Sequence, residues 1–83
     1  MSAHTVSAST DAGRTVQDFT IQAMADPGSL PRVLEVFAKR GLVPCYVHAV
    51  RTEPVGGLVV DLHLADASAE EARLIAQELR RQF

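Results

Sequence analysis

The side chains best suited to acid–base or metal chemistry are few in this sequence of 83 residues. Asp61 and His63 are two residues apart, so on a β-strand they would share one face and could meet as a carboxylate–imidazole pair. His48 could join them from a neighbouring strand. Three such residues without a cleft are a poor metal site, and the outward alternation of a half-buried sheet favours a solvated face instead.

Cys45 is the only cysteine, which excludes an internal disulfide and a zinc site made of several thiolates. No general base can be assigned to it, and its place within an expected strand predicts a small buried hydrophobic side chain. The parts needed for catalysis are therefore almost absent, and we predict a protein that is not an enzyme and holds no metal.

The segment Asp26-Pro27-Gly28 combines a turn with the expected start of a helix. Backbone N–H groups at a helix N-terminus, here those of Gly28, Ser29 and Leu30, can hold a carboxylate. Gly28 would let a ligand or a partner's backbone approach closely. A plain turn that begins a helix is the alternative, and the spacing alone leaves both open.

Two segments around this turn have clear periods. Apolar residues alternate at positions 19, 21, 23 and 25, which predicts a half-buried strand over 17–25. The period then changes to that of a helix, which Gly41 should end in the left-handed conformation. Either Asp26 or Ser29 could be the N-cap. The apolar stripe of this helix is Leu30, Val33, Leu34, Phe37 and Ala38.

The second half of the chain predicts two strands and a helix. The stretch 42–52 is typical of a strand, and Pro44 places it at a sheet edge because proline cannot donate to a ladder. Residues 53–57 form a turn, and a third strand follows with Leu58, Val60, Leu62 and Leu64 directed inward. Ser68 and Glu71 form a capping box. The stripe of the second helix is Ala72, Ile75, Ala76, Leu79 and Phe83.

The element order βαββα predicts an α+β fold, a two-layer ferredoxin-like sandwich with two helices on one face of an antiparallel sheet. The fourth strand that normally lies beside the first is missing, so the first strand should be a second exposed edge. Residues 1–15 are rich in Ser, Thr, Ala and Gly and are predicted to be a flexible tail, with a single domain over 16–83.

Charge and composition exclude several classes of protein. The net charge is −2 and no basic run exists, which argues against nucleic acid as a partner. The apolar stretches are too short to span a membrane, and the N-terminus lacks the pattern of a secretory signal. We therefore expect a cytoplasmic protein. The stacking aromatics of an RNA-recognition module and the paired cysteines of a metal-delivery domain are also absent.

The stretch ADPGSLPRVLEVFAKRGL at residues 25–42 resembles the ACT domain, a small regulatory module that binds amino acids at dimer interfaces. Within that superfamily, residues 32–49 (RVLEVFAKRGLVPCYVHA) resemble the small regulatory subunits of acetohydroxyacid synthase (acetolactate synthase), especially the short isozyme II type. The resemblance implies a non-catalytic homodimer that activates the large catalytic subunit in branched-chain amino-acid biosynthesis. Thiamine diphosphate, magnesium and FAD are then expected only on that catalytic partner. A free-standing ACT-domain amino-acid sensor of a different metabolic enzyme is the alternative.

The resemblance also implies a ligand site between two copies. The turn residues Asp26, Pro27, Gly28, Ser29 and Leu30 of one copy would face Val43, Tyr46 and His48 of the other. Feedback-sensitive members carry asparagines where this sequence has Ala25 and Val43. Neither side chain can hydrogen-bond an amino-acid head group, so weak or absent valine binding is expected.

Overall fold

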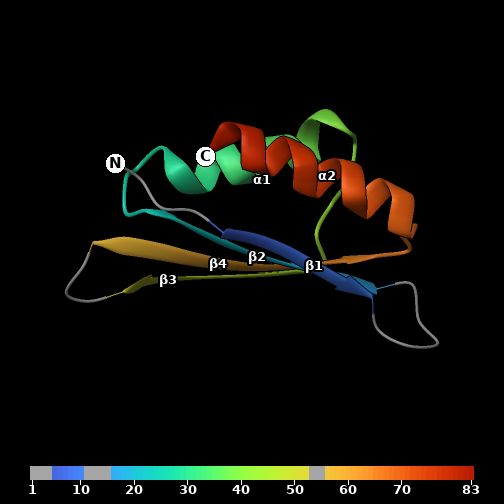
Figure 1. The fold of residues 1–83 in the computed structure, drawn as a ribbon, viewed down its shortest axis with the longest axis horizontal. Coiled ribbons are helices and arrows are strands. Elements are labelled where there is room, and N and C mark those ends of the chain that lie inside the picture. The colour runs from blue at the N-terminus through green and yellow to red at the C-terminus, as the bar shows by residue number, and fades with distance from the viewer. Residues whose placement is uncertain (1–4, 11–15, 53–55) are drawn as a thin grey trace.

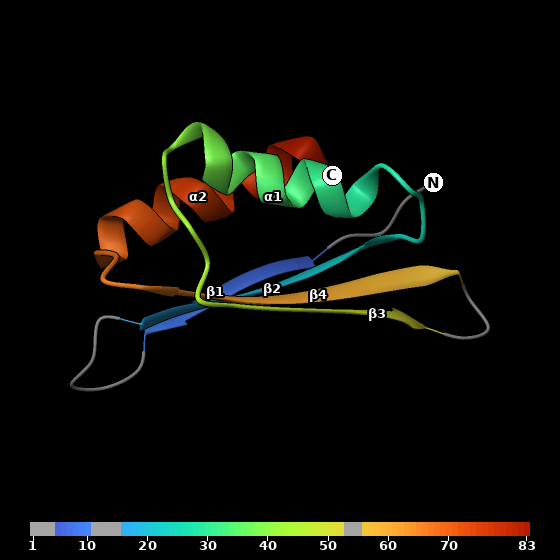
Figure 2. The ribbon, with the colours of Figure 1, turned by 180° about the vertical axis from the view of Figure 1, so that it is seen from behind.

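The computed structural model describes residues 5–10, 16–52 and 56–83, which form two layers (Figure 1). Helices α1 (Ser29–Lys39) and α2 (Ala69–Gln82) lie together on one face of a sheet. The strands are β1 (Thr5–Thr10), β2 (Val16–Met24), β3 (Tyr46–Thr52) and β4 (Gly57–Ala65). The view from behind shows the same separation, with both helices on one side and no described element on the other face of the sheet (Figure 2).

The sheet has the order β1-β2-β4-β3, and every neighbouring pair is antiparallel. Helix α1 connects β2 to β3 while β4 lies between these two strands, which is the split arrangement of the ferredoxin-like plan. The predicted ferredoxin-like α+β class with both helices on one face is therefore confirmed.

The N-terminal segment differs from the prediction of a flexible tail over 1–15. Residues Thr5–Thr10 form β1, which pairs with β2 from Thr5 opposite Gln22 to Thr10 opposite Gln17. Strand β1 thus occupies the edge position that the missing last strand would take, so β2 is not an edge strand. The Ser- and Thr-rich composition gives no apolar period, so no strand was predicted here. A strand can nevertheless be held by backbone pairing to the open edge of a sheet. The rest of the predicted tail, 1–4 and 11–15, lies outside the described residues.

The core lies between the helices and the two central strands. Inward positions alternate along β2 and β4 as predicted, with Phe19, Ile21, Val60 and Leu62 at most 1% exposed. The rings of Phe19 and Phe37 meet edge to face at 5.5 Å between centroids, which joins β2 to α1. The buried hydrophobic set also includes Ala23, Val33, Val36, Leu64, Ala67, Ala72, Ile75, Ala76 and Leu79.

Helix α1 begins one residue earlier than a Ser29 cap would allow, because Gly28 is the N-cap and no side chain caps it. Both predicted caps, Asp26 and Ser29, are therefore wrong. The buried stripe is also rotated slightly from the prediction: Val36 is fully buried, whereas Ala38 is exposed. Gly41 ends the helical segment with φ +70°, as predicted.

Helix α2 confirms its predicted stripe and the Ser68 half of its predicted capping box. The Ser68 hydroxyl accepts a hydrogen bond from the Glu71 backbone N–H at 3.0 Å. Ala72, Ile75, Ala76 and Leu79 are buried, and Phe83 packs partly buried against the same core. Within the described ranges, neither helix is long and apolar enough to cross a membrane.

The start of β3 and the place of Cys45 both differ from expectation. Pro44 lies before the strand, which begins at Tyr46 and forms the predicted sheet edge. Cys45 is exposed rather than buried, because the helices do not extend over this edge. Its backbone N–H and its thiol both donate to the carbonyl of His63, at 2.8 and 3.3 Å. Residues 53–55 of the predicted 53–57 turn lie outside the described residues, and β4 begins at Gly57.

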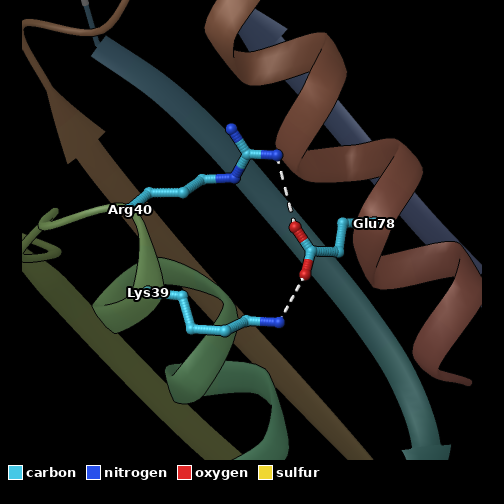
Figure 3. A network of polar contacts seen from close by, with 3 residues as sticks. All are labelled: Lys39, Arg40 and Glu78. Carbon is cyan, nitrogen blue, oxygen red and sulfur yellow. Dashed lines mark hydrogen bonds and ion pairs between the residues drawn. The ribbon is translucent and has the colours of Figure 1, made fainter.

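A carboxylate on α2 joins the two helices (Figure 3). Glu78 accepts hydrogen bonds from Lys39 Nζ at 2.7 Å and from Arg40 at 3.2 Å, both at the C-terminal end of α1. The hydrogen bond from Lys39, with a smaller contribution from Arg40, lowers the pKa of the Glu78 carboxyl below its ordinary value.

We predict that Phe37→Ala destabilises the domain by about 3–5 kcal/mol, because it removes a fully buried ring and leaves a cavity beside Phe19. Urea unfolding followed by circular dichroism measures the change. Leu74→Ala is the control, since Leu74 is 37% exposed and its loss should change the midpoint little. Equal midpoints for the two variants would contradict this core.

We predict that Glu78→Gln lowers the melting temperature at pH 7, and that this difference becomes smaller as the pH falls into the acidic range. A carboxyl whose pKa is lowered by folding stabilises the native state above its unfolded pKa of about 4.3, and this stabilisation is lost as the pH falls through the lower folded value. Thermal melts across this range test it. Glu35→Gln, at an exposed position on α1, is the control, and a pH-independent difference for Glu78→Gln would contradict the assignment.

Candidate functional site

The loop between β2 and α1 is held by several backbone hydrogen bonds. The Ala25 N–H donates to the Gly56 carbonyl at 2.9 Å, which ties the loop to the start of β4. The Asp26 carboxylate accepts from the Gly28 N–H at 3.2 Å, and the Asp26 carbonyl accepts from the Ser29 N–H at 2.9 Å. This is a closed turn in which the side chain of Asp26 supports its own loop.

Ser29 anchors the first turn of α1 to the end of β2. Its side chain is buried, and its hydroxyl donates to the Met24 carbonyl at 2.9 Å. The hydroxyl therefore serves tertiary structure rather than capping the helix. Of the predicted turn residues, Asp26, Pro27 and Leu30 line a hollow, whereas Gly28 and the buried Ser29 do not.

This hollow has a volume of about 400 Å³ and opens between the loop and the adjacent strands. Arg51 of β3 and Leu58 of β4, which are opposite each other in the sheet, complete its wall together with Ala25. Apolar surface, one carboxylate and one guanidinium suit a small organic molecule with charged groups. Sequence reasoning missed Arg51. Pairing the two predicted strands across their connecting turn could have found it, because this pairing places Arg51 opposite the inward Leu58, at the end of β3 nearest the loop.

A smaller hollow of about 160 Å³ lies on the other side of Asp26. Arg32 lines it, and the guanidinium lies 5.6 Å from the ring centroid of Phe83. This cation–π contact holds the C-terminal end of the described chain against the start of α1. The remaining wall comes from Ala23, Met24, Ser29 and Gln82.

The other three predicted site residues are not part of the hollow in one chain. Val43 lies in the loop before β3 and is 84% exposed. Tyr46 and His48 lie on the face of the sheet opposite the helices, because side chains alternate along β3 and Arg51 lies on the helix side. Tyr46 is also five residues from Arg51, roughly 16 Å along the strand. Their approach to a ligand through a second copy remains a prediction.

Strand β3 is exposed along almost its whole length. On the helix side, Val47 is 43% exposed because α1 and α2 cover the central strands and not this edge. On the opposite face, Tyr46 and Val50 are each 45% exposed. The strand thus offers an open backbone edge with apolar side chains on both faces, which is suited to pairing with another strand.

Asp61 and His63 share one face of β4 but do not form the considered pair. His63 Nε2 lies 3.6 Å from Asp18 of β2, and Asp61 instead accepts a hydrogen bond from the Thr20 hydroxyl at 3.0 Å. The ring of Tyr46 stacks on that of His63 at 4.5 Å and faces that of His48 at 6.3 Å. Across the described ranges, no group of three His, Cys, Asp or Glu side chains could hold a metal ion.

Fold and site together define a small ferredoxin-like module with a loop-bounded hollow and an open strand edge. Comparison with models of known families matches residues 9–82 to the ACT-like domain. The chain therefore belongs to the ACT-like domain family, whose members are regulatory, non-catalytic modules that commonly bind small amino acids and dimerise. No curated protein and no solved structure gave a match. The match begins within β1, so the family domain includes part of the strand that was expected to be tail.

We predict that Ser29→Ala destabilises the domain by about 1 kcal/mol through loss of the partly buried hydrogen bond to Met24. Hydrogen exchange should show faster exchange of the loop amides at Ser29 and Arg32. Ser68→Ala is the control, because it removes the cap of α2 and should leave the loop amides protected. Unchanged exchange in Ser29→Ala would mean that the hydroxyl does not anchor the loop.

Proposed function

We propose that this chain is a non-catalytic regulatory subunit of acetohydroxyacid synthase that activates the large catalytic subunit in branched-chain amino-acid biosynthesis. The observation that carries the proposal is the exposed β3 edge beside the loop of an ACT-like domain. A module that works by assembly needs such an uncovered strand. The resemblance of residues 32–49 to the small subunits of this enzyme supplies the identity of the partner.

Two copies would assemble through their β3 strands. Antiparallel pairing around a two-fold axis would satisfy the open backbone edge and bring Val47 of each copy into contact. The loop at Asp26 in one copy would then approach the β3 region of the other. An 83-residue domain has a thin core, so burial of this edge would also stabilise it.

Activation would follow from binding to the catalytic subunit in its active arrangement. A binding partner shifts a conformational equilibrium only by its difference in affinity for the two states. The regulatory chain therefore needs no reactive group of its own. Thiamine diphosphate, magnesium and FAD would remain on the catalytic subunit.

Valine feedback is proposed to be weak or absent. Ala25 lines the hollow with a methyl group, and Val43 is exposed with no polar atom on its side chain. Neither can donate or accept the hydrogen bonds that a desolvated amino-acid head group requires.

A free-standing amino-acid sensor of another metabolic enzyme is the second candidate. It is favoured by the hollow itself, where Asp26 and Arg51 place opposite charges beside apolar surface. A sensor must bind a small molecule on its own, whereas an activating subunit need not. Isothermal calorimetry with amino acids therefore separates the two.

We predict that adding this chain to the acetohydroxyacid synthase catalytic subunit of the same organism increases acetolactate formation several-fold, and that millimolar valine leaves the increase unchanged. Acetolactate is measured by its colorimetric conversion to acetoin. The chain alone should form none.

A Val47→Lys variant provides the matched test of assembly, because a charge in the two-fold contact opposes edge pairing. It should elute as a smaller species in size-exclusion chromatography and activate less than the parent chain. Activation with strong valine inhibition would retain the subunit and refute the argument from Ala25 and Val43. Absence of activation and of complex formation would favour the sensor.

A further inference from the structure

Among the described residues, no helix or strand covers the face of the sheet opposite the helices in either view (Figures 1 and 2). We define the open face as the outward positions of β2, β3 and β4, which alternate with the buried ones. Its members are Val16, Asp18, Thr20, Gln22, Met24, Tyr46, His48, Val50, Thr52, Gly57, Val59, Asp61, His63 and Ala65.

The basic side chains are distributed unequally over the two sides of the domain, whereas carboxylates lie on both sides. Every Lys and Arg among the described residues lies in the helix layer, at its ends, or on the helix side of β3: Arg32, Lys39, Arg40, Arg51, Arg73, Arg80 and Arg81. The described open face carries two carboxylates, Asp18 and Asp61, and two histidines. A surface of this kind attracts cations and not anions.

The carboxylates and rings of the open face are close together and accessible. The Tyr46 ring centroid lies 4.5 Å from that of His63 across the sheet and 6.3 Å from that of His48 along β3, with interplanar angles of 29° and 21°. Asp18 lies 3.6 Å from His63 Nε2, and the side chains of these two residues are 43% and 41% exposed. Asp61 is oriented by one hydrogen bond from Thr20, which leaves further acceptor capacity on its carboxylate.

This combination favours arginine over other partner groups. A guanidinium is planar, stacks on aromatic faces and donates in a fork to a carboxylate, whereas an ammonium is a compact, strongly hydrated charge. Stacked rings flanked by carboxylates offer both contacts at one place. Met24, Val50 and Val59, at the other end of the open face, supply the apolar surface that a protein interface needs beside its charged contacts.

We propose that the open face docks a partner protein surface that presents arginine side chains, with a guanidinium against Tyr46 and His63 and paired to Asp18 or Asp61. The inference rests on the proposed function, because the partner is the enzyme that the module regulates. Edge pairing through the β3 backbone leaves this face accessible. A second copy fits less well, because its own open face carries the same carboxylates and, among its described residues, no Lys or Arg.

The contact chemistry can be tested without the enzyme. Titration of ¹⁵N-labelled protein with N-acetyl-L-argininamide should shift the backbone amides of Tyr46, His63 and Asp61 more than N-acetyl-L-lysinamide does. Tyr46→Ala should reduce these shifts several-fold, and Leu74→Ala on α2 is the exposed apolar control. Shifts that map to the helices, or that are unchanged in Tyr46→Ala, would overturn the proposal.

The second experiment uses the catalytic subunit of acetohydroxyacid synthase. Asp18→Asn/Asp61→Asn keeps side-chain shape but removes both charges, and we expect at least a tenfold higher concentration for half-maximal activation. Glu70→Gln, an exposed carboxylate on α2, should behave like the parent. Equal activation by the double variant would overturn the docking surface and retain the proposed function. No activation by the parent would refute the proposed function, and the argininamide titration would then decide the open face alone.

Discussion

Two helices cover one face of a four-stranded sheet and are too narrow to reach all of its strands. This difference in width determines which side chains of the domain are exposed. The Phe19–Phe37 contact fixes α1 over β2, and Leu79 and Ile75 of α2 close the same core. Nothing in the described helix layer extends over β3, so its side chains stay exposed on both faces. Apolar side chains exposed together at one edge are typical of an interaction surface, and the proposed assembly is based on them.

The regular parts of the fold could be predicted from sequence because their signals were local. The alternation in β2 and β4, the stripe of α2 and its Ser68 cap all follow from spacing along one element. Strand β1 could not be found in this way, because Thr, Ser and Ala give no apolar period and its pairing partner is β2. The exposure of Cys45 could not be predicted either, because its burial depends on how far α1 and α2 extend over the sheet, and no pattern within one element gives that extent.

The candidate site was predicted in part. The loop at Asp26 was found because Pro27 and Gly28 mark a turn before a helical period. Arg51 was missed because it is brought to the loop by strand register, opposite Leu58 and near the Ala25–Gly56 hydrogen bond. Tyr46 and His48 were assigned to the ligand by resemblance, whereas their positions along β3 place them on the other face from the hollow.

The tight hydrogen bonding of the loop limits how the domain can transmit a signal. Asp26, Ser29 and Ala25 all have partners within the loop or in the strand ends, so the loop has little freedom to close over a ligand as a lid. A ligand in the hollow would instead contact Arg51 of β3 and Leu58 of β4 directly. Its binding energy would therefore act on the edge strand, which is also where a second copy would pair. Under the proposed function, a ligand would therefore regulate this domain by changing its assembly rather than by moving a loop.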